Sequence, residues 1–175
     1  PSLNDTALAI PLASQAGLGE YGRHGLVITP EFGPRVRFGK IFTDAPLDHD
    51  APVEFGVSAF CEVCRRCTDA CPPKAIPNGE PSPVKLNRSA IGGVRKWSVD
   101  GEKCFSYWTQ IVTDCMICMR VCPYNKDFSR WRHRVGRRLA ATGLRRVMLR
   151  LNDRLGYGER LRPRAWWAGA TRRRA

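Results

Sequence analysis

All eight cysteines of the chain lie between residues 61 and 122, in two runs whose spacing is typical of iron–sulfur ligands. The first run is C-x2-C-x2-C-x3-C-P and begins at Cys61. The second run is C-x2-C-x3-C-P and begins at Cys115, and Cys104 lies eleven residues before it. The first run matches the pattern of two-cluster bacterial ferredoxins, whose thiolates bind 4Fe-4S clusters. The cysteines therefore predict electron transfer through two such clusters.

In the two-cluster pattern, three cysteines of a run bind one cluster and the fourth binds the other cluster. This rule divides the eight cysteines into two sets of four ligands. The first cysteine set is Cys61, Cys64, Cys67 and Cys122, and the second cysteine set is Cys71, Cys104, Cys115 and Cys118. Cys104 takes the place of the cysteine that a symmetric second run would contain. The two sets leave no cysteine over.

Three other uses of the cysteines compete with this interpretation. Disulfides need an oxidising compartment, and two runs of such close spacing make a poor disulfide framework. Two zinc sites would also use eight thiolates, but zinc modules usually come as separate C-x2-C pairs rather than as a triple followed by Cys-Pro. Free buried thiols would not recur at fixed spacing. The pattern favours iron–sulfur clusters, with zinc as the main alternative.

The charge of the chain is concentrated in its last fifty residues. The chain has 29 Lys and Arg against 16 Asp and Glu, a net charge of +13, and residues 126–175 alone hold 16 basic and 3 acidic residues. A content of 43% hydrophobic residues argues against a disordered chain. No apolar run approaches the roughly 18–20 residues of a membrane-spanning helix, and no secretory signal opens the sequence. Because the chain begins at Pro1 with no leader, we expect a piece of a longer protein.

The pattern of apolar residues and helix breakers predicts an α+β chain in three parts. Residues 1–55 have a helix at 7–16 and strands at 26–29 and 36–42, which cannot close a core by themselves. Residues 56–126 form the dicluster ferredoxin-type domain, with short helices at 70–76 and 114–121, a Pro-rich loop at 77–89 and a strand at 91–99. Residues 127–175 form a basic amphipathic helical segment, with apolar positions every three or four residues and interruptions at Gly136 and Gly143.

Several segments outside the cysteine runs carry a family resemblance. They are Asn-Asp at 4–5, Ala-Gly-Leu-Gly-Glu-Tyr-Gly-Arg at 16–23, Ile-Thr-Pro-Glu-Phe-Gly-Pro-Arg-Val-Arg at 28–37, Phe-Thr-Asp at 42–44, Lys-Cys-Phe-Ser-Tyr-Trp at 103–108, residues 115–126, Tyr-Gly at 157–158 and Trp-Trp at 166–167. Together they resemble the corrinoid-dependent reductive dehalogenases. The resemblance covers nearly the whole chain and is closer than that to the epoxyqueuosine reductases, which share Ala-Gly-Leu-Gly.

The resemblance implies a fold and an activity that the spacing alone does not give. Family members bind base-off cobalamin in a nitroreductase-like core beside two 4Fe-4S clusters. Electrons pass through the clusters to cobalt, and reduced cobalt cleaves the carbon–halogen bond of a halogenated organic substrate. Residues 1–55 would then be the end of the cobalamin-binding core. Most of the corrinoid-binding segment and the family's tyrosine proton donor would lie upstream of Pro1, so this chain alone is expected to be inactive.

The resemblance also implies roles for four residues, each with a structural alternative. Asn4 is similar to an active-site polar residue of the family, and its alternative role is to cap a helix. Arg37 is similar to the basic residue that assists the proton donor and holds halide or phenolate, but on an alternating strand it can equally be solvated or paired. Phe38 and Trp108 resemble walls of the substrate pocket, and Trp108 can equally pack against the clusters.

The sequence does not identify the binding partner of the basic segment. Its simplest interpretation is a helix that packs on the body and exposes its arginines to solvent. Its functional interpretations are attraction to an anionic membrane surface or membrane anchor subunit, or to an acidic electron donor such as reduced ferredoxin or flavodoxin. Nucleic-acid binding is disfavoured because no nucleic-acid module accompanies the arginines. A peripheral membrane location and a cytoplasmic one are both compatible with the sequence.

Two main functions follow from these patterns. The chain is expected to be the electron-transfer and active-site-completing part of a reductive dehalogenase. The alternative is a stand-alone dicluster ferredoxin-type carrier, and an epoxyqueuosine-reductase-like corrinoid enzyme is a third possibility. Residues 1–55 discriminate between the first two, because a stand-alone ferredoxin has no use for an unclosed segment that bears Asn4 and Arg37.

Overall fold

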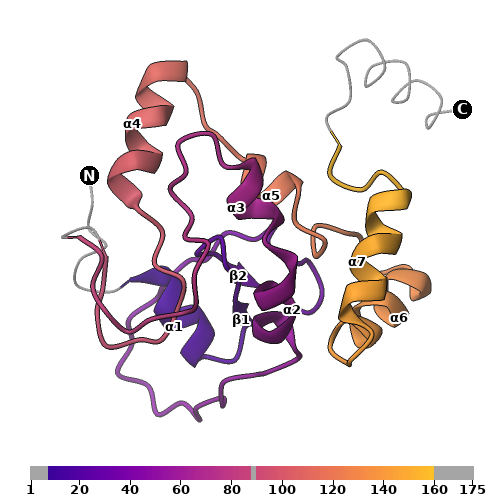
Figure 1. Cartoon of the computed structure of the whole chain (residues 1–175). Coiled ribbons are helices and arrows are strands. Elements are labelled where there is room, and N and C mark those ends of the chain that lie inside the picture. Colours follow the sequence, from indigo (N-terminus) through magenta and orange to yellow (C-terminus); the bar gives the residue numbers. More distant parts are fainter. Residues whose placement is uncertain (1–7, 88–89, 160–175) are drawn as a thin grey trace, which may run out of the picture.

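The computed structural model describes residues 8–87 and 90–159, and within them it has seven helices and two short strands. Figure 1 shows three groups of elements: the hairpin and α1 beside α2, the pair α3 and α5 above them, and the pair α6 and α7 at one side. Helix α4 stands away from the rest of the body (Figure 1). The arrangement is an α+β fold in which short elements and ordered coil surround the cysteines.

The N-terminal part is built on one helix and a short hairpin. Helix α1 spans Ala9–Gln15, and strands β1 (Glu20–Tyr21) and β2 (Val27–Ile28) pair antiparallel, with Glu20 opposite Ile28. Val27 and Ile28 are fully buried, which anchors the hairpin in the core. The expected helix at 7–16 and the buried strand at 26–29 therefore form, although both are shorter than expected.

Three expected elements do not form. Residues 35–55 are coil, and most of them are exposed, so the strand expected at 36–42 is wrong. The strand expected at 91–99 is reduced to one bridge between Ser82 and Lys96, and the helix expected at 70–76 is replaced by one that ends at Ala70. A strand needs a neighbour to satisfy its backbone hydrogen bonds, and the described residues offer none beside 36–42.

The cysteine runs lie on short helices at the centre of the body. Helix α2 spans Val57–Cys64, α3 spans Arg66–Ala70 and α5 spans Ile117–Arg120. The N-cap of α2 is Gly56, which has no side chain to serve as a cap. The carboxylate of Glu20 accepts hydrogen bonds from the backbone N–H groups of Val57 (3.1 Å) and Ser58 (3.4 Å) and takes over that function.

Two apolar clusters hold the body together. The larger joins Ile28, Val57, Phe60, Trp97 and Tyr124 and extends to Phe128 and Ala140. The smaller surrounds Cys67 and Cys71 with Ala75 and Ile76. Gly33 sits against the larger cluster with φ of +60°, where an added Cβ would overlap the carbonyl oxygen of Tyr124.

The basic segment forms two helices instead of one. Helix α6 spans Trp131–Ala140 and runs through Gly136 without a break, whereas α7 spans Arg145–Arg154 after a turn at 141–144. The interruption expected at Gly136 is therefore wrong, and the one at Gly143 is confirmed. Arg145 donates to the carbonyl of Ala59 (3.0 Å), Arg137 donates to that of Pro30, and Arg66 pairs with Asp153. These contacts fix the pair α6 and α7 on α2 and its neighbours.

Candidate iron–sulfur centre

The local structure of the first run explains how its cysteines face different directions. Cys61 and Cys64 are one turn apart on α2, so they lie on the same side of that helix. Arg65 then adopts the left-handed conformation, with φ of 51°, and ends α2 before α3 begins. The chain turns there and presents Cys67 from α3, and Cys71 lies at the end of α3 as its C-cap. A run of eleven residues thus reaches both sides of the short helix pair.

The first cysteine set comes together around the end of α2. Burial raises the pKa of the Cys122 thiol well above its usual range, and the neighbouring thiols of Cys61, Cys64 and Cys67 raise it further. Burial also raises the pKa of Cys61 to about 12, with a further upward contribution from Cys64 and Cys67. All four cysteines line one cavity. Cys122, from the second run, therefore joins the three cysteines of the first run.

The second cysteine set gathers between α3, α5 and the long helix α4, which spans Gly101–Ile111. Burial raises the pKa of Cys118 to about 11, and Cys115, Cys104 and Cys71 raise it further. The pKa of Cys104 is likewise raised by burial and then by Cys71 and Cys115. Helix α4 begins at Asp100, whose side chain accepts from the Lys103 N–H at 3.1 Å. This cap places Cys104 in the first turn of α4.

The residues fit two 4Fe-4S clusters. All eight cysteines are free thiols, so they are available as the two predicted sets of four ligands. Within the described residues, no three His, Cys, Asp or Glu side chains converge on one point as ligands of a single ion. A tetrahedral zinc site needs four such ligands at one point, whereas a 4Fe-4S cluster takes each thiolate on a different iron atom.

An unpartnered N–H group of His24 also fits a cluster bound by the first cysteine set. His24 is buried and its Nδ1 accepts from the Leu26 N–H at 3.2 Å, so its Nε2 carries the proton. That Nε2 has no hydrogen-bond partner among the described residues, and His24 lines the cavity of the four cysteines. Burial lowers the pKa of His24 to about 4, so it is neutral. Sulfur atoms of a bound cluster are acceptors of the kind this N–H lacks.

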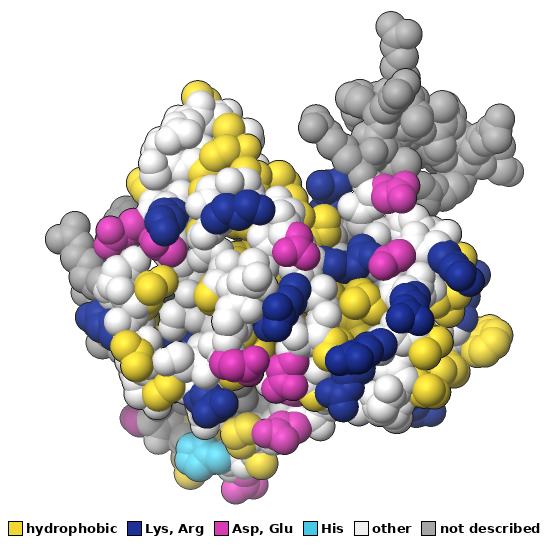
Figure 2. All heavy atoms as spheres, in the orientation of Figure 1, with side chains coloured by type: hydrophobic (Ala, Val, Ile, Leu, Met, Phe, Trp, Pro, Cys, Tyr) yellow, Lys and Arg dark blue, Asp and Glu magenta, His cyan; other side chains and the backbone are white. Residues whose placement is uncertain are grey.

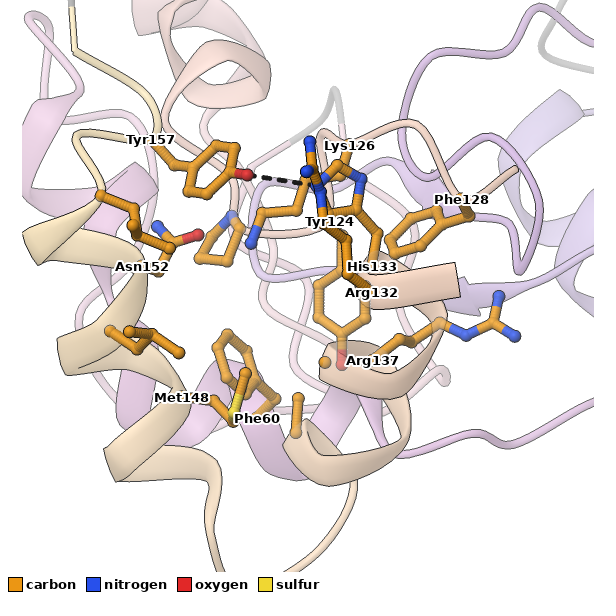
Figure 3. Close-up of a pocket in the computed structure, with 15 residues that line it drawn as sticks. Phe60, Tyr124, Lys126, Phe128, Arg132, His133, Arg137, Met148, Asn152 and Tyr157 are labelled. Carbon is orange, nitrogen blue, oxygen red and sulfur yellow. Dashed lines mark hydrogen bonds between the residues drawn. The ribbon is translucent and has the colours of Figure 1, made fainter. Parts of the chain in front are cut away.

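A larger pocket lies behind the first cysteine set, and Figure 3 shows its lining residues. It has a volume of about 180 Å³ and lies between α6, α7 and the segment that follows Cys122. Its walls are mainly apolar, and the cations Lys126, Arg132 and Arg137 stand around it. Both polar atoms of the buried Asn152 side chain have no hydrogen-bond partner within residues 8–87 and 90–159. No sequence motif pointed to this pocket, because its residues come from four separate segments.

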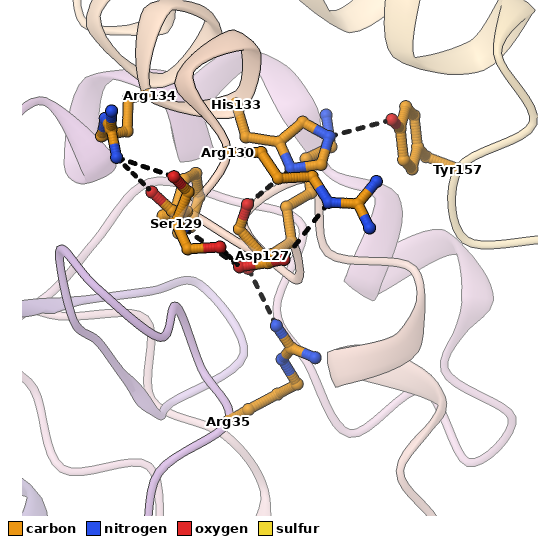
Figure 4. Close-up of polar contacts among 9 residues, drawn as sticks. Arg35, Asp127, Ser129, Arg130, His133, Arg134 and Tyr157 are labelled. Carbon is orange, nitrogen blue, oxygen red and sulfur yellow. Dashed lines mark hydrogen bonds and ion pairs between the residues drawn. The ribbon is translucent and has the colours of Figure 1, made fainter. Parts of the chain in front are cut away.

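A network of polar contacts ties the segment after Cys122 to the two basic helices (Figure 4). The carboxylate of Asp127 accepts from the backbone N–H and hydroxyl of Ser129, which lowers the pKa of Asp127. Arg35 donates to the carbonyl of Lys126 at 2.9 Å. His133 contacts the carbonyl of Asp127 and the hydroxyl of Tyr157, at 2.7 and 3.1 Å. The segment after Cys122 is thus anchored through residues to which the sequence analysis assigned no structural role.

The four residues assigned by resemblance are not brought together among the described residues. Asn4 lies outside the described residues. Arg37 is exposed and Phe38 half-buried, both in the coil after β2. Trp108 lies on α4, half-buried, and its Nε1 has no partner. No hydrogen bond or ring contact in the described part of the chain joins Arg37 or Phe38 to Trp108, so their roles stay predictions.

Comparison with known proteins gives this site a class. The family model described as a 4Fe-4S double cluster binding domain matches residues 60–125. This range contains both cysteine sets, and the chain therefore carries a domain of the class that binds two 4Fe-4S clusters. Cluster binding, rather than zinc binding, is confirmed for this class.

The chain as a whole is similar to longer proteins. It is 44% identical over 141 residues to a tetrachloroethene reductive dehalogenase of Desulfitobacterium hafniense, covering 78% of this chain and 25% of that protein. It is 39% identical to the tetrachloroethene reductive dehalogenase of Sulfurospirillum multivorans, covering 97% of this chain and 34% of the relative. A solved reductive dehalogenase described as B12-dependent matches with a TM-score of 0.73 and 30% identity, over 86% of this chain and 21% of its own.

These matches confirm the resemblance seen in the sequence. The chain is related in sequence and fold to the reductive dehalogenases, and it spans about a third or less of the relatives it matches. Within the described residues, no helix has the length and apolar character needed to cross a membrane.

Proposed function

We propose that this chain is the part of a reductive dehalogenase that carries electrons, through two 4Fe-4S clusters, to a corrinoid held mainly by the rest of the protein. The observation that carries the proposal is the presence of eight free cysteines in a 4Fe-4S double cluster binding domain, within a chain that is 39–44% identical to tetrachloroethene reductive dehalogenases. Bound clusters supply one-electron transfer. The described residues hold them, exclude water from the first set and donate hydrogen bonds beside it.

The proposed substrate is a halogenated organic compound, and the proposed reaction is reductive cleavage of its carbon–halogen bond. The relatives named above act on tetrachloroethene. Arg37 and Phe38 are proposed for the active site because their coil is exposed in this chain and is free to meet further protein. Asn4 and Trp108 are proposed on family resemblance. In this arrangement Arg37 supplies a cation beside the departing halide.

The test uses the longest native protein that contains this sequence, purified without oxygen from its host. We expect a mass well above 19.7 kDa, a co-purifying corrinoid, and release of chloride from tetrachloroethene with a chemical reductant. Arg37→Gln should lower the rate of chloride release at least tenfold. Arg95→Gln, which removes an equally exposed charge, should leave it unchanged. A native mass of 19.7 kDa with iron but no cobalt would instead establish a stand-alone electron carrier.

We further propose that an acidic electron-donor protein docks on the basic helices. The exposed arginines of α6 and α7 form a cationic face made of Arg132, Arg134, Arg138, Arg146, Arg150 and Arg154. In Figure 2, Lys and Arg side chains gather over this part of the molecule, with apolar side chains between them. Arginines interleaved with exposed apolar residues such as Trp131 and Val147 are typical of protein interfaces. Because α7 packs on α2, a donor docked there lies close to the first cysteine set.

Reversing this charge tests the docking. The double variant Arg138→Glu and Arg146→Glu should slow reduction of the clusters by reduced flavodoxin about tenfold or more at low salt. The difference should shrink as salt screens the charges. Arg95→Glu serves as the control for charge reversal elsewhere. If the double variant loses binding to anionic vesicles but is reduced at the normal rate, the face binds membrane and the donor proposal is wrong.

A further inference from the structure

The side chain of Arg23 is the most deeply buried charge among the described residues. Its exposed fraction is 1%, and it lies in the turn between β1 and β2. Its Nε donates to the carbonyl of Cys61 at 3.0 Å, and Nη1 donates to the carbonyls of Pro77 and Gly79 at 2.9 and 3.0 Å. Three of its five N–H groups thus hold the backbone of Cys61 and of the loop after the first run.

The rest of the chain seals Arg23 from water. The indole ring of Trp97 lies over the guanidinium, 4.6 Å from the ring centroid, and Trp97 itself is 3% exposed. Its Nε1 donates to the carbonyl of Gly79 at 2.9 Å, the same oxygen that accepts from Arg23. The guanidinium is therefore fixed in position and desolvated.

No carboxylate pairs with this buried cation in the described part of the chain. The ion pairs of the described residues involve Arg66, Lys103 and Arg130, and the nearby buried Glu20 is engaged with the backbone of α2. Taking a charge out of water without a counter-charge is costly. Neutral carbonyl acceptors solvate such a charge but do not balance it. An anion beside Arg23 would offset that cost.

The position of Arg23 shows where that anion is. Arg23 lines the same cavity as the four cysteines of the first set. Its Nε donates to the carbonyl of Cys61, so the guanidinium is held against the backbone of one ligand of that set. A cluster with four thiolates carries net negative charge, and that charge grows when the cluster is reduced.

We propose that Arg23 is the counter-charge of the first cluster and a positioning residue that sets its reduction potential above that of the second cluster. The proposal rests on the two-cluster function above. A fixed cation in a desolvated site stabilises the more negative, reduced form of its neighbour. His24, with its unpartnered Nε2–H in the same cavity, acts in the same direction as a hydrogen-bond donor. The second set has no buried cation of this kind among the described residues.

The test is an anaerobic redox titration of the cluster-loaded chain, followed by electron paramagnetic resonance. Arg23→Gln removes the charge, Arg23→Lys keeps it, and Arg95→Gln removes an exposed charge as the matched control. We expect Arg23→Gln to shift one of the two midpoint potentials to a more negative value and to leave the other unchanged. Arg23→Lys should retain most of the wild-type potential, and Arg95→Gln should change neither. His24→Gln should produce a smaller negative shift of the same midpoint.

Each remaining outcome decides the question. If Arg23→Gln holds both clusters and neither midpoint moves, Arg23 only supports the fold and the proposal is overturned. If Arg23→Gln does not hold the clusters, the Arg23→Lys variant decides the question. An unchanged midpoint potential in Arg23→Lys supports the proposal that the positive charge sets the potential. A large negative shift in that variant rejects the proposal. If neither variant holds the clusters, Arg23 is a structural support and not a regulator of potential. An iron count before titration separates this failure from failure of the two-cluster function, because the wild-type chain must contain both clusters.

Discussion

The two cysteine sets have the same number of ligands but very different surroundings. The first set is enclosed by the chain itself, under Phe60 and Tyr124, beside the buried Arg23 and behind α6 and α7. The second set is only partly covered: Cys71 is buried in the smaller apolar cluster, and Cys104 and Cys118 pack against it half-buried. Helix α4, which carries Cys104, has no buried residue, and Phe105 and Val112 are 65% and 88% exposed. Apolar side chains at the end of the molecule that bears α4 are visible in Figure 2.

This difference lies in how much apolar surface each cysteine set leaves exposed. Exposed apolar side chains around a metal centre are unusual in a finished fold, because they leave the ligands open to water. The chain spans a third or less of its relatives, so we infer that further protein covers α4 and the second set there. The first set needs no such cover. The predictions below test this contrast, from the largest expected effect to the smallest.

Removing single ligands should break the two sets separately. Cys122→Ala should cost the first cluster and Cys115→Ala the second, so each variant should hold about four iron atoms where the full chain holds about eight. Cys71→Ala tests the crossed ligands. It should lose the same cluster as Cys115→Ala, although Cys71 belongs to the first run. Iron analysis with electron paramagnetic resonance provides the measurement, and loss of the first-set signal in Cys71→Ala would reject the assignment.

Removing an aromatic ring beside the first cysteine set should cost much more stability than removing one beside the second cysteine set. Phe60 is 2% exposed and its ring meets that of Tyr124 edge-on at 5.4 Å, so Phe60→Ala leaves a cavity in the core. We expect it to lower the free energy of unfolding by about 3–5 kcal/mol. Phe105→Ala, on the exposed face of α4, should change it by no more than about 0.5 kcal/mol. Denaturant unfolding of the cluster-loaded chain measures both, and equal losses would contradict the contrast.

The prediction from sequence succeeded where the chemistry fixes the residue types. Cysteine spacing predicted a domain with two 4Fe-4S clusters, and the matching family model confirms that class. It failed at 36–42, where alternating residues look like a strand but no neighbouring strand is present among the described residues. It also missed helix α4, although Asp100 three residues before Lys103 is a recognisable N-cap.

The supporting residues of the first set were harder to find. Arg23 lies in the Gly-rich turn after β1 and Glu20 lies in β1 itself. Both look like ordinary surface charges in the sequence, because their burial depends on segments 35 or more residues away. Asn152 is unremarkable in a basic amphipathic helix, yet it is 3% exposed in the pocket of Figure 3. No local pattern reports contacts of this range, and only the folded structure shows them.

A substitution of Glu20 should have a smaller effect on stability near the first cysteine set. Its carboxylate accepts backbone N–H groups at the start of α2, where Gly56 offers no cap. Glu20→Gln keeps the size of the side chain but halves the acceptor oxygens and removes the charge. We expect a loss of about 1–3 kcal/mol in the free energy of unfolding. Glu54→Gln, an exposed carboxylate nearby, is the control. If both variants lose the same amount, the cap at α2 contributes nothing specific.

The smallest expected effect is a difference between the two clusters of one intact chain in the rate at which they lose iron to a chelator. An iron chelator must reach the cluster, and the second cysteine set has one buried thiol, Cys71, whereas the first has two, Cys61 and Cys67. We expect iron to leave in two phases, with the second cluster lost several-fold faster than the first. Spectra taken between the phases identify the surviving cluster, and the Cys115→Ala variant should show the slow phase alone.

In the longer native protein the fast phase should slow, because the proposed cover over α4 would close the second set. A fast phase that persists there would mean that α4 is exposed by design, and that the second cluster, rather than the first, faces the electron donor.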